Sequence, residues 1–98
     1  MSRVPPSEEE IRRRSKELFR NAYMLEVCAA IDKAGGRVNL TSLVGDSGLS
    51  PSLYSGPLRR LAGLGLLVDD PQPTDDRRER WYKPAKSRLW ATARQLST

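Results

Sequence analysis

The chain has 98 residues, enough for one small domain with a single hydrophobic core. Its 17 lysines and arginines against 12 aspartates and glutamates give a net charge of +5, which favours a polyanionic partner. With one cysteine and no histidine, an intrachain disulfide is excluded and no cysteine/histidine metal cluster is expected. No nucleophile, base and orienting group appear at a recognisable spacing, so we expect neither an enzyme nor a cofactor.

No apolar run reaches the roughly 20 residues that a membrane-spanning helix needs. The charged start of the chain also lacks the apolar centre of a signal peptide. We therefore expect no membrane partner and a cytoplasmic location.

The N-terminal third predicts a flexible arm and then one long helix. Residues 1–7 form the arm, and a capping box that begins at Ser7 opens a helix over residues 8–34. Between residues 22 and 31 this helix is apolar on nearly every face, which requires two packing partners. One is the core of the domain, and the other is expected to be a second copy of the chain, because an exposed face would leave a large hydrophobic patch.

The middle of the chain predicts a short helix, a turn and a longer helix. Asn39 has the position of an N-cap for the short helix. Ser50 as N-cap and Pro51 as first helical residue then predict a helix over residues 50–64. Gly65 is expected to end that helix in a left-handed conformation.

The dipeptide Gly56–Pro57 interrupts the longer helix. A proline inside a helix removes one backbone hydrogen bond and costs roughly 3 kcal/mol. Two alternatives remain open from the sequence. Either the helix is bent, or its regular part begins at Pro57 with Gly56 as its cap.

The C-terminal third predicts a β-hairpin and a last helix. Residues 66–69 and 80–83 have strand character on either side of a polar, turn-rich segment, so a hairpin is expected over residues 66–83. A helix over residues 87–97 closes the chain. The expected fold is therefore mainly α with a small β-hairpin, in a single domain over residues 8–98.

Three residues that invite a functional interpretation are better explained by packing. Cys28 has apolar helical neighbours and no cation to stabilise a thiolate, so we expect a core residue and not a redox switch. Trp81 and Tyr82 alternate in a strand, so one should pack in the core while the other covers the hairpin.

The order helix, short strand, helix, turn, helix, two-stranded hairpin and helix resembles a winged helix-turn-helix transcriptional regulator. The resemblance covers about residues 20–96, and it is carried by Val38–Leu43, Gly48–Ser52, Leu58–Leu61, Gly65–Leu67 and Arg80–Tyr82. The compact MarR and ArsR types are the most similar, and the run Asp75-Asp76-Arg77-Arg78 resembles the wing of the MarR type. The metal ligands of ArsR-type sensors are missing, so metal sensing is not expected.

The resemblance implies that residues 50–64 enter the major groove of DNA while the hairpin, as the wing, reaches phosphates or the minor groove. The candidate DNA-binding residues are Asn39, Thr41, Ser42, Ser50, Ser52, Leu53, Ser55, Gly56, Arg59, Arg60, Arg77, Arg78 and Arg80. Structural alternatives stand beside these roles. The wing arginines also suit charge balance against the four aspartates of the hairpin, and Arg59 and Arg60 also suit solubility or an ion pair. The arginine run at residues 12–14 is interpreted as a solvated helix face.

The expected function is that of a sequence-specific double-stranded DNA-binding transcriptional regulator, a dimeric repressor associated with the nucleoid. The terminal helices, residues 8–34 and 87–97, are expected to form the homodimer through Leu18, Phe19, Ala22, Tyr23, Leu89, Trp90, Ala93 and Leu96. Two alternatives are a winged-helix module that binds another protein and an architectural DNA-binding factor for plasmid, phage or chromosome maintenance. The sequence leaves open whether a small-molecule effector binds, and it does not identify one.

Overall fold

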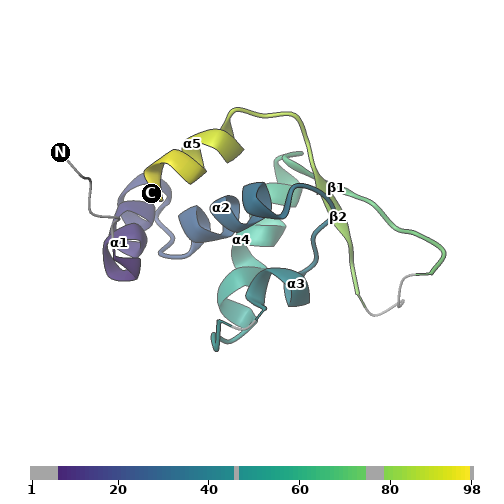
Figure 1. Ribbon diagram of the computed structural model, residues 1–98, viewed down its shortest axis with the longest axis horizontal. Coiled ribbons are helices and arrows are strands. Elements are labelled where there is room, and N and C mark those ends of the chain that lie inside the picture. Colours follow the sequence, from purple (N-terminus) through teal and green to yellow (C-terminus); the bar gives the residue numbers. More distant parts are fainter. Residues whose placement is uncertain (1–6, 46, 75–78, 98) are drawn as a thin grey trace.

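The computed structural model describes residues 7–45, 47–74 and 79–97, and within these ranges it is mainly helical with one small antiparallel hairpin (Figure 1). The elements are α1 (Glu8–Phe19), α2 (Met24–Ala34), α3 (Leu40–Val44), α4 (Ser52–Gly63), β1 (Leu67–Asp69), β2 (Tyr82–Pro84) and α5 (Leu89–Leu96). This confirms the coarse fold class expected from the sequence. No helix in the described ranges has the length and apolar character needed to cross a membrane.

The expected single helix over residues 8–34 is wrong, because the chain turns between α1 and α2. Arg20 has a φ of 55°, in the left-handed region, and its N–H donates to the carbonyl oxygen of Lys16 at 2.9 Å. Of the expected arm, residues 1–7, the structure describes only Ser7. Its hydroxyl caps α1 by accepting the N–H of Glu10 at 3.1 Å.

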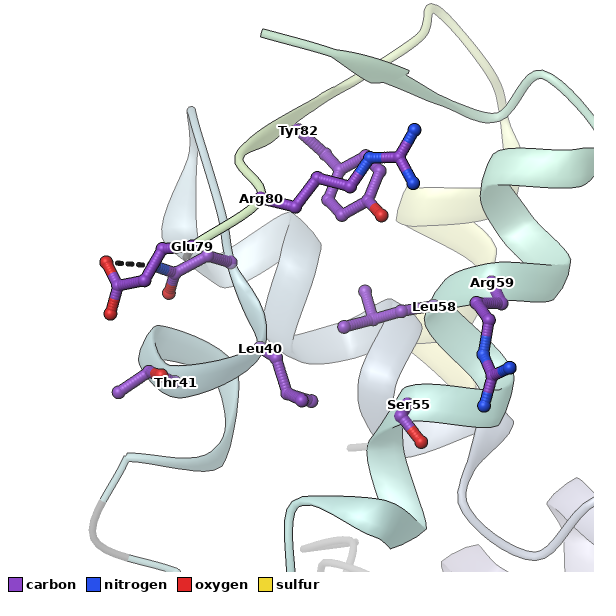
Figure 2. A pocket seen from close by; sticks show the side chains of 9 residues that line it. Leu40, Thr41, Ser55, Leu58, Arg59, Glu79, Arg80 and Tyr82 are labelled. Atoms are coloured by element: carbon purple, nitrogen blue, oxygen red, sulfur yellow. Dashed lines mark hydrogen bonds between the residues drawn. The ribbon is translucent and has the colours of Figure 1, made fainter. Parts of the chain in front are cut away.

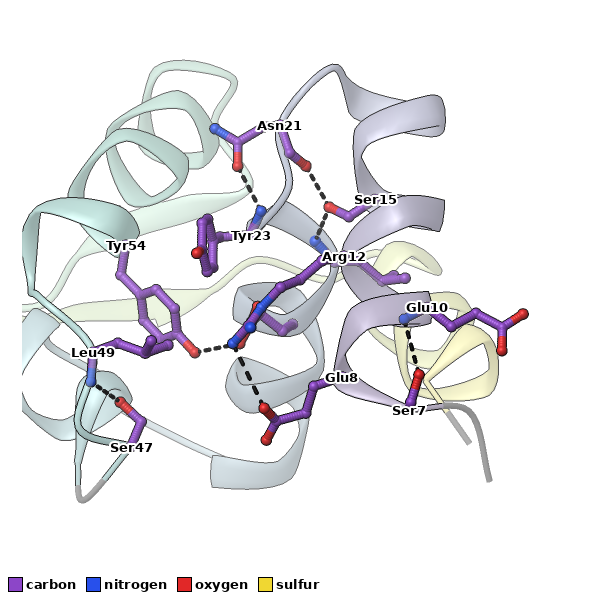
Figure 3. Close-up of polar contacts among 12 residues, drawn as sticks. Ser7, Glu8, Glu10, Arg12, Ser15, Asn21, Tyr23, Ser47, Leu49 and Tyr54 are labelled. Carbon is purple, nitrogen blue, oxygen red and sulfur yellow. Dashed lines mark hydrogen bonds and ion pairs between the residues drawn. The ribbon is translucent and has the colours of Figure 1, made fainter. Parts of the chain in front are cut away.

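A buried hydroxyl and an amide side chain hold this turn (Figure 3). Ser15 is fully buried, and its hydroxyl donates to the carbonyl oxygen of Asn21 and accepts the N–H of Leu25 at 2.8 Å. The Asn21 side chain accepts the N–H of Tyr23 at 2.9 Å. These bonds satisfy backbone groups that a continuous helix would have paired internally, so the break leaves few of them without partners.

α2 is the central helix, and α1, α3, α4 and α5 all pack against it. Its buried residues are Met24, Leu25, Val27, Cys28 and Ile31. The second apolar face, expected against another copy of the chain, is covered by α5 of the same chain. Burial among these helices raises the pKa of the Cys28 thiol to about 11, as befits the core residue expected from the sequence.

The residues expected at a dimer interface mostly pack inside the protomer. Trp90 and Ala93 are buried, which removes them from any surface available to a second copy. Phe19, Tyr23, Leu89 and Leu96 are partly buried against the core, and Ala22 is half-buried. Leu18 differs, because 59% of its surface is exposed.

The hairpin forms close to its expected position, with β1 starting one residue later and β2 two residues later than the pattern indicated. The paired residues are Leu67 with Pro84, Val68 with Lys83, and Asp69 with Tyr82. Val38, just before α3, adds a bridge on the other side of β2: its N–H donates to the Tyr82 carbonyl at 2.8 Å and its carbonyl accepts the Tyr82 N–H at 2.9 Å. The start of α3 is thereby fixed beside the hairpin.

Tyr82 of β2 and Trp81, which precedes it, divide between the core and the surface of the hairpin, as expected. Tyr82 is buried in the core, and Trp81 is half-buried under the Arg37 guanidinium, which lies 4.5 Å from the ring centre. Arg37 also forms an ion pair with Asp70 at 3.0 Å. The hairpin base is therefore attached to the core by Tyr82 and to the loop before α3 by the Arg37 contacts.

α4 begins at Ser52 and continues through Pro57, so the alternative in which its regular part starts at Pro57 is wrong. The Ser50 hydroxyl does not cap the helix, because it bonds to the Ser52 hydroxyl at 2.9 Å. Gly56 suits the position before the proline, since the clash that disfavours helical backbone there involves a Cβ that glycine lacks. Pro57 itself is buried.

The end of α4 confirms the role expected of Gly65. This glycine has a φ of +77°, its N–H donates to the Ala62 carbonyl at 3.1 Å, and the N–H of Leu66 donates to the Leu61 carbonyl at 2.9 Å. The two bonds form a Schellman motif, which turns the chain directly from α4 into β1.

Gly63 and Gly65 provide a matched pair of stability variants. Gly65→Ala should lower the free energy of unfolding by about 1 kcal/mol, because alanine resists a positive φ. Gly63→Ala should raise it by up to about 1 kcal/mol, because Gly63 lies in the helix with open space around its Cα. Urea denaturation followed by circular dichroism measures both changes, and two variants of the same sign would contradict this account of the turn.

Candidate nucleic-acid interface

α3, α4 and the start of β2 surround an open pocket of about 260 Å³ (Figure 2). It is lined by Asn39, Leu40, Thr41, Ser55, Leu58, Arg59, Glu79, Arg80 and Tyr82. Five of these were DNA-binding candidates from the sequence: Asn39, Thr41, Ser55, Arg59 and Arg80. Arg59 and Arg80 also line a neighbouring pocket between the second half of α4 and the hairpin. The two arginines therefore lie where α4 and the hairpin meet.

The outward side of α4 presents small side chains and one arginine. Ser52, Gly56, Arg59 and Gly63 follow one another at helical spacing and are all exposed, and we call them the outer face of α4. The opposite side of the helix packs into the core. Both glycines have open space where a Cβ would lie, so the backbone of a partner can approach closely. In the described part of the chain no ion pair engages Arg59, whose guanidinium extends from the helix (Figure 2).

Two candidates on α4 lie away from the outer face. Leu53 is half-buried against the core, where it is not available to read bases. Arg60 points toward α1 and donates to the Phe19 carbonyl oxygen at 3.4 Å. Adjacent helical residues differ in direction by about 100°, which explains why Arg59 and Arg60 serve different surfaces.

The serines before and within the first turn of α4 are engaged locally. The Ser50 and Ser52 hydroxyls bond to each other, and the Ser55 hydroxyl donates to the Ser52 carbonyl oxygen at 3.1 Å. Ser50 and Ser52 are exposed, and Ser55 is half-buried at the edge of the pocket. Their hydroxyl oxygens keep acceptor capacity for a partner.

The side chains of two other candidates, Asn39 and Ser42, form hydrogen bonds to groups of the protein itself. The Asn39 side chain accepts the Ser42 N–H at 2.7 Å, and the Ser42 hydroxyl accepts the Asn39 N–H at 3.0 Å, so the expected N-cap is confirmed as a capping box. The side-chain NH2 of Asn39 donates to the Glu79 carboxylate at 3.2 Å (Figure 2). Asn39 is only 4% exposed, so it shapes the site and is not available to a phosphate. Thr41 is exposed on the same short helix.

Arg80 extends from the hairpin and is paired with Asp69 on the adjacent strand. The guanidinium donates two hydrogen bonds to the carboxylate, at 3.0 and 3.1 Å, and these bonds raise the pKa of Arg80 above its ordinary value. Both side chains are more than half exposed, and such pairs exchange readily for another anion. The pair of Arg80 with Asp69 agrees with the alternative from the sequence, in which the hairpin arginines balance the charge of the hairpin aspartates. Arg77 and Arg78 lie outside the described residues.

Sequence reasoning missed a polar cluster behind α4. The half-buried Glu26 carboxylate of α2 accepts a hydrogen bond from Arg12 of α1 at 2.9 Å and another from the hydroxyl of Tyr54 of α4 at 2.8 Å. Figure 3 shows Arg12 and Tyr54 converging there, with Arg12 also 5.0 Å from the Tyr23 ring centre. Burial and the Glu26 bond raise the pKa of Tyr54, and the same carboxylate raises that of Arg12.

This cluster corrects the interpretation of residues 12–14 as a solvated face. Arg12 is half-buried, and Arg14 donates to the carbonyl oxygen of Leu96 at 3.0 Å, joining α1 to the end of α5. Arg13 alone of the three is exposed, between Glu10 and Glu17. The available signal was Glu26, a charged residue among the apolar residues of the first two turns of α2.

Comparison of the chain with protein-family models, with curated proteins and with solved structures finds no match. Within the ranges that the structure describes, no group of three or more acidic, cysteine or histidine side chains is placed to hold a metal ion. We therefore infer the function from the arrangement of α4 and the hairpin.

Asn39 and Thr41 separate a structural role from a surface role on the same helix. Asn39→Ala should lower the free energy of unfolding by about 1 kcal/mol, because the first turn of α3 loses its cap and Glu79 loses its partner. Thr41→Ala should change it by less than about 0.5 kcal/mol, because Thr41 is exposed. Chemical denaturation distinguishes the two, and equal effects would contradict the structural role given to Asn39.

Proposed function

We propose that the protein is a winged helix-turn-helix transcriptional regulator that binds double-stranded DNA sequence-specifically, as a dimeric repressor. The observation that carries this proposal is the outer face of α4, which combines small residues with Arg59, an arginine that has no ion pair in the described part of the chain, beside an exposed hairpin. A net charge of +5 supports an anionic partner of this kind.

The major groove of DNA, about 12 Å wide, admits an α-helix that has no bulky side chains on its leading face. Ser52, Gly56 and Gly63 meet that condition, and Arg59 has the planar donor pattern that binds guanine or phosphate with paired hydrogen bonds. α3 packs against α4 and helps to hold it in place. With a single arginine on the outer face, few bases are read directly, and DNA shape supplies part of the specificity.

The hairpin is the wing in this proposal. Arg80 already lies beside Arg59 along the same surface, and contact with DNA exchanges its Asp69 partner for a phosphate. Asn39 contributes indirectly, because its bond to Glu79 holds the start of the wing against α3.

The dimer in this proposal does not use the second apolar face of α2, because α5 covers that face. The exposed Leu18 on α1 is the apolar surface residue that still suits a second copy. Two-fold symmetry would set the two copies of α4 about 34 Å apart on an inverted repeat.

Arg59→Ala and Arg13→Ala test the proposed interface with the same loss of charge. Fluorescence anisotropy is measured over a salt series with random DNA and with a fragment from upstream of the protein's own gene. Arg59→Ala should weaken binding to the upstream fragment by about 1–3 kcal/mol, while Arg13→Ala on α1 should have little effect.

Other outcomes assign the alternatives. Equal binding to both DNAs indicates an architectural factor, whereas no binding at low salt indicates a module that binds another protein. Equal losses for the two variants would remove Arg59 from the interface.

Asp69→Asn and Asp32→Asn test whether Arg80 exchanges its Asp69 partner for a DNA phosphate. Asp69→Asn frees Arg80 and removes a negative charge from the surface, so DNA affinity should rise several-fold and depend more steeply on salt. Asp32→Asn breaks an ion pair with Arg94 on α5 and should leave affinity nearly unchanged. An Asp69→Asn variant that binds no more tightly than Asp32→Asn would exclude a phosphate contact by Arg80.

A further inference from the structure

A cavity of about 280 Å³ lies on the side of α4 that carries Arg60, away from the outer face. Four helices supply its walls: the end of α1 with Phe19, α2 with Met24 and Cys28, α4, and the start of α5 with Leu89. Leu64, at the end of α4, is 70% exposed beside it. The cavity is therefore open to solvent at one side and enclosed by core residues at the other.

The lining is apolar except for one cation. A water molecule needs two to four polar partners, and these walls offer few, so the cavity suits an apolar occupant better than water. Arg60 has one hydrogen bond in the described structure, at 3.4 Å to Phe19, out of five guanidinium N–H donors. A positive group with donors to spare at the edge of an apolar space is complementary to an apolar molecule with an anionic end.

We propose that this cavity binds a small apolar molecule carrying one anionic group, such as a carboxylate. The apolar part lies among Met24, Leu61 and Leu89, and the anionic group receives hydrogen bonds from Arg60. The volume is just below the roughly 300–1,000 Å³ of pockets for drug-sized ligands, so the molecule is smaller than those. The site is separate from the outer face of α4, and its occupancy does not depend on the proposed function.

Isothermal titration calorimetry on the full chain tests the chemistry with three probes that share one alkyl chain: octanoate, 1-octanol and octylammonium. Octanoate should bind at one saturable site at least tenfold more tightly than octanol, and octylammonium should bind more weakly than both. Octylammonium binding as tightly as octanoate, or no saturable octanoate site, would overturn the proposal.

Two pairs of variants locate the site. Arg60→Gln should remove the preference for octanoate over octanol, whereas Arg59→Gln, with the same charge change on the adjacent residue, should leave it intact. Leu64→Gln should weaken the binding of octanoate and octanol alike by several-fold, whereas Leu18→Gln, at another exposed leucine that does not line the cavity, should not. All four residues are on the surface, so the variants are expected to fold.

Indistinguishable results within either pair would overturn the assignment. Sedimentation equilibrium provides a second test. If the protein is a dimer that Leu64→Gln dissociates, and if octanoate does not bind to that dimer, a second copy covers the cavity and the proposal is overturned. The titrations contain no DNA, so their failure would leave the proposed DNA-binding function standing.

Discussion

The Glu26 carboxylate is the constraint on which the placement of α4 depends. It projects from α2, the helix that all the other helices contact, and accepts hydrogen bonds from both Arg12 and Tyr54. A half-buried carboxylate is tolerated only when it is paired, so the three side chains favour one relative arrangement of α1, α2 and α4. With Tyr54 held inward, the opposite side of α4 must face outward. The small residues and Arg59 of the outer face are presented to solvent for that reason.

The sequence predicted the helix ends that depend on hydrogen bonds between residues close together in the chain. Asn39 and Gly65 end or begin helices through bonds to residues within a few positions, so their roles were readable from spacing alone. The break near Arg20 was not readable, because no proline or glycine marks it and the turn depends on Ser15 reaching Asn21 and Leu25 in the folded protein. The same limit produced the expectation of a second copy against α2. The pattern showed that a partner was needed without showing that α5 supplies it.

For the candidate interface too, the sequence predicted which residues lie on a helix face but not which residues they bond to. Helical periodicity was sufficient to place Arg59 on the outer face, opposite the buried residues of α4. Periodicity gave no information on partners across the fold, such as Glu79 for Asn39, Asp69 for Arg80 and the Phe19 carbonyl for Arg60. Each of these polar residues looked available in the sequence because its partner lies 11 to 41 positions away. Exposure and hydrogen bonding therefore reduce a list based on residue type to the outer face of α4 and the hairpin.

Pro57 has a consequence for motion within α4. Lacking an N–H, it cannot bond to the Leu53 carbonyl, so the backbone hydrogen-bond ladder has a gap between the first turn and the remainder. Leu58 and Leu61 anchor the helix in the core after the gap, and Tyr54, bonded to Glu26, anchors it before the gap. Only the residues ahead of Tyr54, which begin with an exposed serine and no side-chain cap, lack such an anchor, so we expect their amide protons to exchange with solvent faster than those after the gap. A helix built this way adjusts its first residues to the surface it meets while Tyr54 and the core residues keep its position in the domain fixed.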